Sequence, residues 1–474
     1  MADGSSPIAA EFISDVKAAL GEKGWSEDPN EIDPHLQDWR GNYKGYSGLL
    51  LKPANTEEVS EVLKLCSRHS VPITPQGGNT GLVNGGIAHG EAVLSLTRLN
   101  SIRSVDPLNN SIVVDAGCIL TNVHDAARDA DRFFPLSLGS QGTATIGGLI
   151  STNAGGVAVL RYGMMRDLLL GLEVVTADGQ IWNGLRGLRK DNTGYDLKHL
   201  FAGAEGTLGV VTAACLKLFP VPQTATAWLT LESVEDAVKL LSFLRDRAGD
   251  TITSFELMRR EGVELTCEEI ENCRDPLPSE SPWRILVEIS LADEGQARAS
   301  LETALEGAFE EGLVSDGAIA SSLSQAEDFW TIRESLPLVK RSFLNSVNHD
   351  VSVPVSRIAE FIEKSEDRLK RDFGDIEIFV FGHLGDGNLH YAVAEPADTG
   401  NPVVRKQAEA ITNTVHAIVT DFNGSISAEH GIGLLKRHEL PDHKSEIELQ
   451  MMRSIKAALD PKNILNPGRI FKLS

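Results

Sequence analysis

Residues 75–81 read Pro75-Gln76-Gly77-Gly78-Asn79-Thr80-Gly81 and follow the apolar stretch 71–74, which is typical of a short strand. Glycine permits positive φ angles and close approach of the backbone to a ligand, so consecutive N–H groups in this loop can surround an anion. The loop has neither the Gly-Lys-Ser/Thr ending of a nucleoside triphosphate site nor the GxGxxG order of a dinucleotide fingerprint. Taken alone, it is explained slightly better as a tight turn than as a binding site.

Two more glycine-rich segments lie farther along the N-terminal half of the chain. One runs from Gly139 to Gly156, and the other spans Gly203–Gly209. Many small residues with short hydrogen-bond donors between them suit a backbone that wraps around an extended polar ligand. Three such segments in one half of the chain favour a large dinucleotide over three unrelated turns.

The composition limits the classes of partner. The 474 residues predict two or three domains, and a hydrophobic content of 42% is sufficient for folded cores. The 44 basic and 67 acidic residues give a net charge of −23. Because nucleic acids and anionic membranes repel such a surface, neither is expected as a partner.

Cysteine usage and the chain start bear on the compartment. The five cysteines form no CxxC pair, so neither a disulfide framework nor a cysteine zinc site is expected. The first residues lack the pattern of a signal peptide, and no apolar run approaches the roughly 18 residues needed to span a membrane. We therefore expect a soluble protein of a reducing compartment, either the cytoplasm or, for a processed eukaryotic chain, the mitochondrial matrix.

The sequence pattern changes near Pro220 and Pro222. Before this point, short helical stripes alternate with β-rich runs. After it, helical stripes separated by pairs of strands predict an α+β sheet with helices on one face. The expected helices are 234–245, 296–311, 326–343, 358–373, 402–422 and 445–459.

The histidines near residue 385 form a candidate metal site. His383 and His390 flank the turn signal Gly385-Asp386-Gly387, which predicts a hairpin that brings the two imidazoles together. Two neutral imidazoles, a carboxylate and an open position are typical of a catalytic metal centre, and Glu429 could supply the carboxylate. An isolated histidine is more often packed or solvated, but two in one motif and a third beside an acid, His430, favour ligation.

Five motifs together resemble the FAD domain of the vanillyl-alcohol-oxidase-type flavoproteins. The resemblance is closer to the branch of D-2-hydroxyglutarate and FAD-linked D-lactate dehydrogenases, and covers most of the chain beyond about residue 40. The motifs are Pro75–Gly81, Thr145–Gly148, Asn153–Gly156, Lys190–Asp196 and Glu205–Gly209. The resemblance implies an α+β fold. We expect a two-part, PCMH-type FAD-binding domain at 1–221, an α+β, ferredoxin-like substrate or cap domain at 222–425, and a C-terminal helical segment at 426–474 that returns to the FAD domain.

The resemblance also implies how FAD is held. Residues 76–81 would bind the pyrophosphate, and residues 139–155 would line the flavin. Many relatives tether the flavin through a histidine at the position of Asn79, so we expect dissociable FAD here. The expected FAD contacts are Pro75, Gln76, Gly77, Gly78, Asn79, Thr80, Gly81, Leu138, Gly139, Ser140, Gly142, Thr145, Ile146, Gly148, Asn153, Ala154, Gly155, Glu205, Gly206 and Val210.

By the same resemblance, His383, His390 and Glu429 match a metal triad that usually holds zinc and could accept manganese or iron. His430 matches the neighbouring base, and Asn388 could donate a hydrogen bond to substrate or flavin. A 2-hydroxy acid can chelate the metal, which lowers the pKa of its hydroxyl. The base then takes the proton while hydride passes from C2 to flavin N5.

Arg333 matches the family arginine that binds a substrate carboxylate. A surface Arg–Glu helix pair is a serious rival explanation from the local sequence. Dicarboxylate-specific relatives have a hydroxyl residue at the position of Pro337 and a lysine at that of Asn348. Without this lysine, tight binding of a second substrate carboxylate is in doubt. Lys340 or Arg341 could compensate, but a solvated helix face explains them better.

The expected activity is oxidation of a D-2-hydroxy acid, with D-2-hydroxyglutarate or D-malate ahead of D-lactate. Electron-transfer flavoprotein, a quinone or a cytochrome would accept the electrons, and a homodimer is one expected assembly. A flavin-free metal hydrolase is a remote alternative because it leaves the glycine loops unexplained. A non-catalytic FAD- or metal-binding protein is a third possibility.

Overall fold

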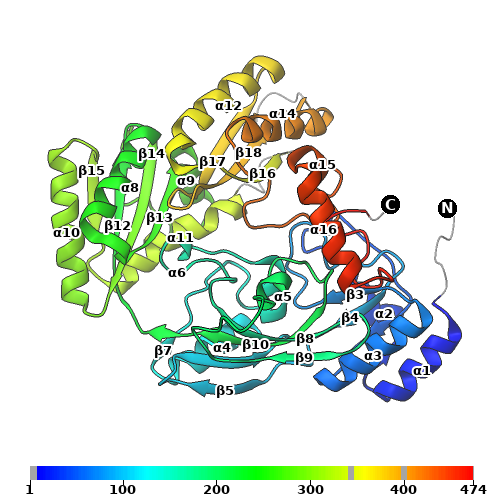
Figure 1. The fold of residues 1–474 in the computed structure, drawn as a ribbon. Helices are drawn as coiled ribbons and strands as arrows, with labels where there is room; N and C mark the ends of the chain where they lie inside the picture. The colour runs from blue at the N-terminus through cyan, green and yellow to red at the C-terminus, as the bar shows by residue number, and fades with distance from the viewer. Residues whose placement is uncertain (1–7, 340–345, 397–402, 473–474) are drawn as a thin grey trace. The chain divides into compact units, whose positions relative to one another are not determined.

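The computed structural model describes residues 8–339, 346–396 and 403–472 (Figure 1). The chain forms two units, each assembled from separate parts of the sequence. Unit 1 comprises Met1–Gly156, Gly163–Val221 and Glu429–Ser474, and unit 2 comprises Val157–Tyr162 and Pro222–Ala428. The chain therefore passes between the units four times.

Unit 1 contains two main sheets. The first has the order β1-β2-β4-β3, in which β2 and β3 both run parallel to β4. The second is antiparallel with the order β5-β6-β10-β8-β9, and β7 pairs with β11 separately. The strands are β1 (Trp25–Ser26), β2 (Leu50–Leu51), β3 (Ile73–Gln76), β4 (Ala92–Ser95), β5 (Ile102–Asp106), β6 (Ser111–Asp115), β7 (Arg132–Phe133), β8 (Leu169–Val175), β9 (Ile181–Gly184), β10 (Val210–Lys217) and β11 (Phe219–Pro220).

The helices of unit 1 cover these sheets. α3 begins where the Asn55 side chain accepts a hydrogen bond from the Glu58 N–H, and its buried stripe packs against α1 and β8. The stripe contains the four residues Val59, Val62, Leu63 and Cys66. The helices are α1 (Ala10–Leu20), α2 (Pro29–Ile32), α3 (Thr56–His69), α4 (Leu120–Arg128), α5 (Ile146–Thr152), α7 (Lys198–Phe201), α15 (Leu440–His443) and α16 (Glu446–Leu459).

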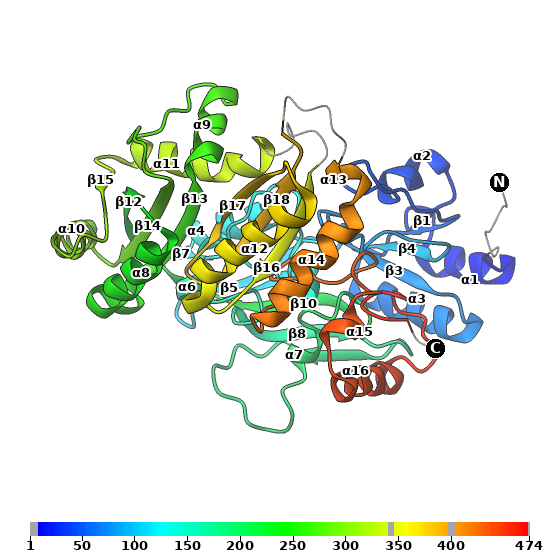
Figure 2. The same cartoon turned by 90° about the horizontal axis from the view of Figure 1, so that it is seen from above.

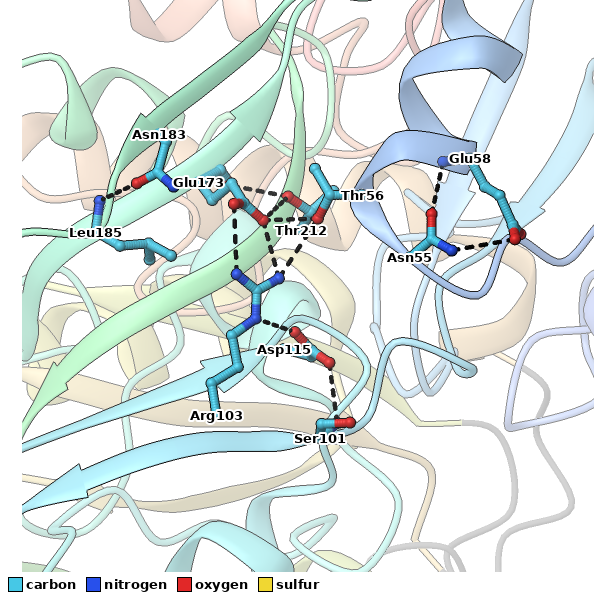
Figure 3. Close-up of polar contacts among 10 residues, drawn as sticks. All are labelled: Asn55, Thr56, Glu58, Ser101, Arg103, Asp115, Glu173, Asn183, Leu185 and Thr212. Carbon is cyan, nitrogen blue, oxygen red and sulfur yellow. Dashed lines mark hydrogen bonds and ion pairs between the residues drawn. The ribbon is translucent and has the colours of Figure 1, made fainter.

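A polar network joins α3 to the second sheet (Figure 3). Arg103 Nε is 2.6 Å from Asp115 Oδ1, and Arg103 Nη2 is 2.9 Å from Glu173 Oε1. Glu173 Oε1 also accepts hydrogen bonds from the hydroxyls of Thr56 and Thr212. Burial alone would raise the pKa of Glu173, but Arg103 and the hydroxyl donors hold it below its usual value.

Unit 2 is built on one antiparallel sheet of seven strands in the order β15-β12-β14-β13-β17-β18-β16. Its strands are β12 (Gln223–Leu231), β13 (Ile252–Arg259), β14 (Trp283–Leu291), β15 (Asp316–Ile319), β16 (Val347–Ser352), β17 (Glu377–His383) and β18 (Asn388–Ala394). The helices are α6 (Val159–Tyr162), α8 (Val234–Ala248), α9 (Arg260–Glu269), α10 (Glu294–Glu310), α11 (Leu323–Val339), α12 (Ile358–Phe373), α13 (Val403–Lys406) and α14 (Ala408–Asp421).

The expectation that helices cover one face of this sheet is only partly right. α8, α10, α12 and α14 pack on one face through the larger apolar core, whereas α9 and α11 lie on the other face (Figure 2). The second face buries alternate residues such as Trp228, Met258 and Phe381 against Phe329 of α11. Both faces of the central strands are apolar, so alternation in the sequence does not reveal which helix lies on which side.

Most of the predicted helices agree with the observed ranges, and residues 340–343 of the predicted helix 326–343 lie outside the described residues. The predicted helix at 402–422 is instead two helices, α13 and α14, because Gln407 leaves helical geometry between them with φ −118°. Across the described residues, no helix combines the length and the apolar character needed to cross a bilayer.

Candidate functional site

The glycine loop that follows β3 presents a row of backbone donors. Asn79 lies in the left-handed region at φ 52°, which turns the chain within the loop. Among the described residues, no group accepts a hydrogen bond from the backbone N–H groups of residues 77–81. Five consecutive N–H groups without a protein acceptor are suited to an anionic ligand.

Side chains hold this loop in place. Gln76 Nε2 donates to the His35 carbonyl at 2.8 Å and to the Gly86 carbonyl at 2.7 Å. Asn79 Nδ2 donates to the Gln37 carbonyl at 2.9 Å. The side chains of Gln76 and Asn79 thus shape the loop and leave the N–H groups of residues 77–81 for a ligand.

The first two glycine segments meet. A Cβ on Gly77 would lie 2.1 Å from Thr145 Oγ1, and a Cβ on Gly78 would lie 2.0 Å from the Thr143 carbonyl oxygen. Only glycine permits this approach. The Thr145 hydroxyl is buried and has no hydrogen-bond partner among the described residues, which is a further polar atom that a ligand could satisfy.

Glu205, an expected FAD contact, uses its side chain for another purpose. Its carboxylate accepts hydrogen bonds from the N–H groups of Ile432 at 2.8 Å and Gly433 at 2.7 Å. Burial raises the pKa of Glu205, although these two hydrogen bonds oppose the increase. Glu205 therefore anchors the segment that follows His430, and a contact between Glu205 and FAD stays a prediction.

In unit 2, strand register gathers the other candidate residues on one face. The hairpin predicted around residues 385–387 is present, and the ring centroids of His383 and His390 are 5.6 Å apart. Alternate residues of a strand share a face, so two rows across β13, β17, β18 and β16 point the same way. One row is Glu256, His383, Asn388 and Ser352, and the other is Met258, Phe381, His390 and Asp350.

Glu256 binds the side chain of His383 and also that of Arg333 from α11. Its Oε1 is 2.9 Å from His383 Nδ1, and its Oε2 accepts from Arg333 Nε and Nη2, each at 2.8 Å. Only 1% of Glu256 and 4% of Arg333 are exposed. Burial alone would raise the pKa of Glu256, but His383 and Arg333 hold it below its usual value.

Further carboxyl groups face the histidine pair. Asp350 Oδ1 is 4.0 Å from His390 Nδ1, and it accepts a hydrogen bond from Asn388 Nδ2 at 2.9 Å. Burial raises the pKa of Asp386 in the hairpin turn, and Glu256 and Asp350 add to this effect. Asp350, Asp386 and the two imidazoles offer oxygen and nitrogen donors of the kind that a divalent cation takes.

The structure limits two of the predicted roles. Arg333 is a buried ion-pair partner of Glu256, so the rival explanation of a surface Arg–Glu pair is wrong. Asn388 Nδ2 donates both to Asp350 and to the Val351 carbonyl, so donation to substrate or flavin would require it to break one of these bonds. Lys340 and Arg341 lie outside the described residues.

Sequence reasoning missed Glu256 and Asp350. The available signal for Glu256 was an acidic residue inside the apolar run Phe255–Met258, a pattern typical of a buried, paired charge. Asp350 follows the polar residues Asn348 and His349, so its neighbours in the sequence gave no such signal.

The remaining candidates, Glu429 and His430, belong to unit 1. His430 Nε2 lies 3.9 Å from Glu429 Oε1. Ala428, the last residue of unit 2, donates its N–H to the Asp350 carbonyl at 3.3 Å, and Glu429 follows it in the chain. Metal ligation by Glu429 stays a prediction.

The chain matches two protein-family models. Residues 222–470 match "FAD linked oxidases, C-terminal domain", and residues 48–184 match "FAD binding domain". Together these matches span most of the chain.

Proteins of similar sequence carry consistent names. A probable mitochondrial D-2-hydroxyglutarate dehydrogenase of Oryza sativa subsp. indica is 39% identical over 99% of this chain and 83% of its own length. The mitochondrial D-2-hydroxyglutarate dehydrogenase of Arabidopsis thaliana is 38% identical over 98% of this chain and 82% of its own. A D-2-hydroxyglutarate–pyruvate transhydrogenase of Saccharomyces cerevisiae is 35% identical over 93% of this chain and 90% of its own length.

Solved structures share the fold at lower identity. p-Cresol methylhydroxylase has a TM-score of 0.76 at 18% identity and covers 99% of this chain and 98% of its own. Alkyldihydroxyacetonephosphate synthase has a TM-score of 0.75 at 18% identity, with coverages of 98% and 86%. These similarities confirm the expected α+β architecture with a PCMH-type FAD-binding fold.

Proposed function

Because the chain belongs to the FAD-linked oxidase family that includes the D-2-hydroxyglutarate dehydrogenases, we propose that it oxidises a D-2-hydroxy acid to the 2-oxo acid. The single observation that carries this proposal is the 39% identity to such an enzyme over 99% of the chain. The glycine loop of unit 1 and the histidine face of unit 2 agree with it.

The residues of unit 1 fit FAD. The N–H groups of residues 77–81 would hold the pyrophosphate, since no protein group among the described residues accepts from them. The buried Thr145 hydroxyl beside this loop would gain a partner. Asn79 cannot form the histidine–flavin bond of some relatives, so the cofactor would be dissociable.

The residues of unit 2 fit a divalent metal. His383 and His390 share one face of the sheet with Asp350, and Glu429 is the proposed carboxylate ligand. Zinc is the first candidate, with manganese or iron as alternatives. When bound, FAD supplies a hydride acceptor and the metal supplies a Lewis acid.

The side chains divide the remaining tasks. His430 would take the proton of the 2-hydroxyl group, since an imidazole has a pKa suited to this exchange near neutral pH. Arg333 would bind a substrate carboxylate through its guanidinium, which Glu256 already orients. Asn388 would hold Asp350 in place beside His390.

The substrate range rests on residues near Arg333. D-2-Hydroxyglutarate and D-malate are the preferred substrates because similar proteins carry the first name and Arg333 offers a second carboxylate site. Pro337 lies inside α11 and Asn348 is exposed on β16, and neither supplies a cation. D-Lactate is therefore the alternative substrate.

Electrons would pass to an electron-transfer flavoprotein, a quinone or a cytochrome, and a homodimer is the proposed assembly. Several similar proteins are named as mitochondrial, so the mitochondrial matrix is the proposed location if the chain comes from a eukaryote.

Anaerobic reduction of the purified, yellow protein by a panel of D- and L-2-hydroxy acids tests the activity. We expect the oxidised-flavin absorbance to bleach with D-2-hydroxyglutarate or D-malate and to persist with the L-enantiomers. Colourless protein with hydrolase activity would favour the flavin-free alternative. Yellow protein that no hydroxy acid bleaches would favour a binding protein.

A further inference from the structure

One buried carboxylate in unit 2 serves two candidate site residues at once. Glu256 Oε1 lies 2.9 Å from His383 Nδ1, and Oε2 accepts both Nε and Nη2 of Arg333 at 2.8 Å. Each oxygen therefore has its own partner. The two partners lie 50 residues apart in the sequence, His383 on β17 and Arg333 on α11.

This contact determines which nitrogen of His383 carries the proton. An ionised carboxylate only accepts hydrogen bonds, so Nδ1 of His383 must be the donor. In a neutral imidazole the lone pair then resides on Nε2, which is the form that a metal ligand requires. Glu256 and His383 are also paired residues of adjacent antiparallel strands, so the backbone supports this orientation.

The same carboxylate orients Arg333. The guanidinium is held side-on by Oε2, and its carbon lies 5.0 Å from the centroid of the Phe381 ring. With 4% of Arg333 exposed, burial leaves the side chain few alternative conformations. An anion that binds Arg333 would therefore compete with Glu256 for the guanidinium, and Glu256 is the same carboxylate that orients His383.

We propose that Glu256 is a positioning residue that sets the tautomer of His383 and the guanidinium orientation of Arg333, and so couples the metal ligand to the substrate clamp. This inference rests on the proposed function, because it assigns His383 to the metal and Arg333 to the substrate. Glu256 itself contacts neither the metal nor the substrate in this scheme.

The test is Glu256→Gln in the full-length, FAD-loaded protein. Glutamine keeps the shape but has one accepting oxygen, so it cannot serve both partners. We expect the dissociation constant for Zn²⁺ or Mn²⁺, measured by competition with a chromogenic chelator, to rise roughly 10–100-fold. At saturating metal, the KM for D-2-hydroxyglutarate should rise more than kcat falls.

Glu288→Gln is the matched control. Glu288 is half-buried on the adjacent strand β14, where its carboxyl group accepts from Trp330 Nε1 and Thr226 Oγ1 and touches neither predicted partner. The Glu288→Gln substitution should leave the metal affinity and the KM for D-2-hydroxyglutarate unchanged. Arg333→Met should raise KM while metal affinity stays near that of the wild type, because the bond between Glu256 and His383 remains.

If Glu256→Gln does not fold, the double variant Glu256→Gln/Arg333→Met removes both buried charges and is compared with Arg333→Met alone. Folded Glu256→Gln with wild-type metal affinity would overturn this inference but not the proposed function. Equal loss of metal in Arg333→Met would also overturn it, since charge balance rather than orientation would then be responsible. Wild-type protein that binds no divalent ion would overturn both this inference and the metal part of the proposed function, whereas flavin bleaching would still test the activity.

Discussion

Glu256 on β13 and His383 on β17 face each other across two antiparallel strands, with 2.9 Å between Oε1 and Nδ1. His390 lies on the same face from β18, with its ring centroid 5.6 Å from that of His383. Strand register, rather than a flexible loop, thus sets the geometry of the two imidazoles. Substitutions of the two histidines should therefore change the site without changing the sheet.

Removal of a proposed metal ligand should abolish turnover. His383→Ala, His390→Ala and Glu429→Gln each delete one ligand, and a site of three protein ligands cannot hold its ion with two. FAD content should stay at the wild-type level because the glycine loops belong to unit 1. Metal analysis, flavin absorbance and turnover measured on the same samples check this expectation.

A surface histidine supplies the control for these variants. His438, whose side chain is 73% exposed, should tolerate replacement by alanine with normal metal content and turnover. A chelator should reproduce the loss in the wild type, and added zinc or manganese should restore activity. Full activity of metal-free enzyme would end the metal proposal.

His430→Ala should separate the base from the metal ligands. We expect flavin reduction to slow by roughly 10²–10⁴, which is the usual contribution of a positioned general base. Metal and FAD content should remain normal. Stopped-flow absorbance under anaerobic conditions measures the rate, and an unchanged rate would rule out His430 as the base.

Arg333→Met should reveal which carboxylate the arginine binds. Methionine fills the buried volume, and loss of a charge-assisted hydrogen bond should cost about 1.5–3 kcal/mol of substrate binding. If Arg333 grips the distal carboxylate, KM should rise for D-2-hydroxyglutarate and D-malate and change little for D-lactate. An equal increase for all three would assign Arg333 to the shared C1 carboxylate.

Acid precipitation should release the flavin. Asn79 occupies the tethering position, and its Nδ2 donates to the Gln37 carbonyl at 2.9 Å. The yellow colour should therefore appear in the supernatant, and colour retained in the pellet would contradict a dissociable cofactor. Asn79→Ala should weaken FAD binding by about 1 kcal/mol, or about fivefold in Kd, because the loop loses one anchoring hydrogen bond.

Glu173→Gln should lower the stability of the protein by about 2–3 kcal/mol, because Glu173 accepts a charge-assisted bond from Arg103 and two hydroxyl bonds (Figure 3). The folded-state pKa of Glu173 is lowered, so its contribution is present above the unfolded-state pKa of about 4.3 and is lost as the pH falls through the folded pKa. Chemical denaturation at pH 7 and at lower pH should show the difference shrinking. Glu61→Gln, which breaks only a surface pair with Lys64, should cost less than about 0.5 kcal/mol.

Local patterns in the sequence predicted much of the fold. The helices α8, α10, α12 and α16 appear close to the ranges where apolar spacing predicted them, because each depends on residues close in sequence. The sides taken by α9 and α11 could not be predicted. Both faces of β12, β13 and β14 are buried, so their apolar runs carry no directional signal.

The candidate site was predictable to the extent that its residues occur in motifs. The turn signal at residues 385–387 predicted that His383 and His390 lie close together. The residues around Glu256 do not indicate that its partner is His383, 127 residues away. A short segment shows the same limit. Residues 157–162 join unit 2 through contacts such as the hydrogen bond from Ser254 Oγ to the Val157 carbonyl at 2.8 Å.

The discontinuity of unit 1 has a consequence for biosynthesis. Lys456 donates to the Thr207 carbonyl at 2.8 Å, and Asn466 Nδ2 donates to the Glu205 carbonyl at 2.7 Å, so residues near 205 are completed by residues made much later. Roughly 200 residues of unit 2 separate these two parts, and at 5–20 residues per second a ribosome needs about 10–40 seconds to translate them. During that interval the N-terminal part of unit 1 is incomplete and exposed to aggregation. The nascent chain is therefore a candidate client for chaperones that act at the ribosome.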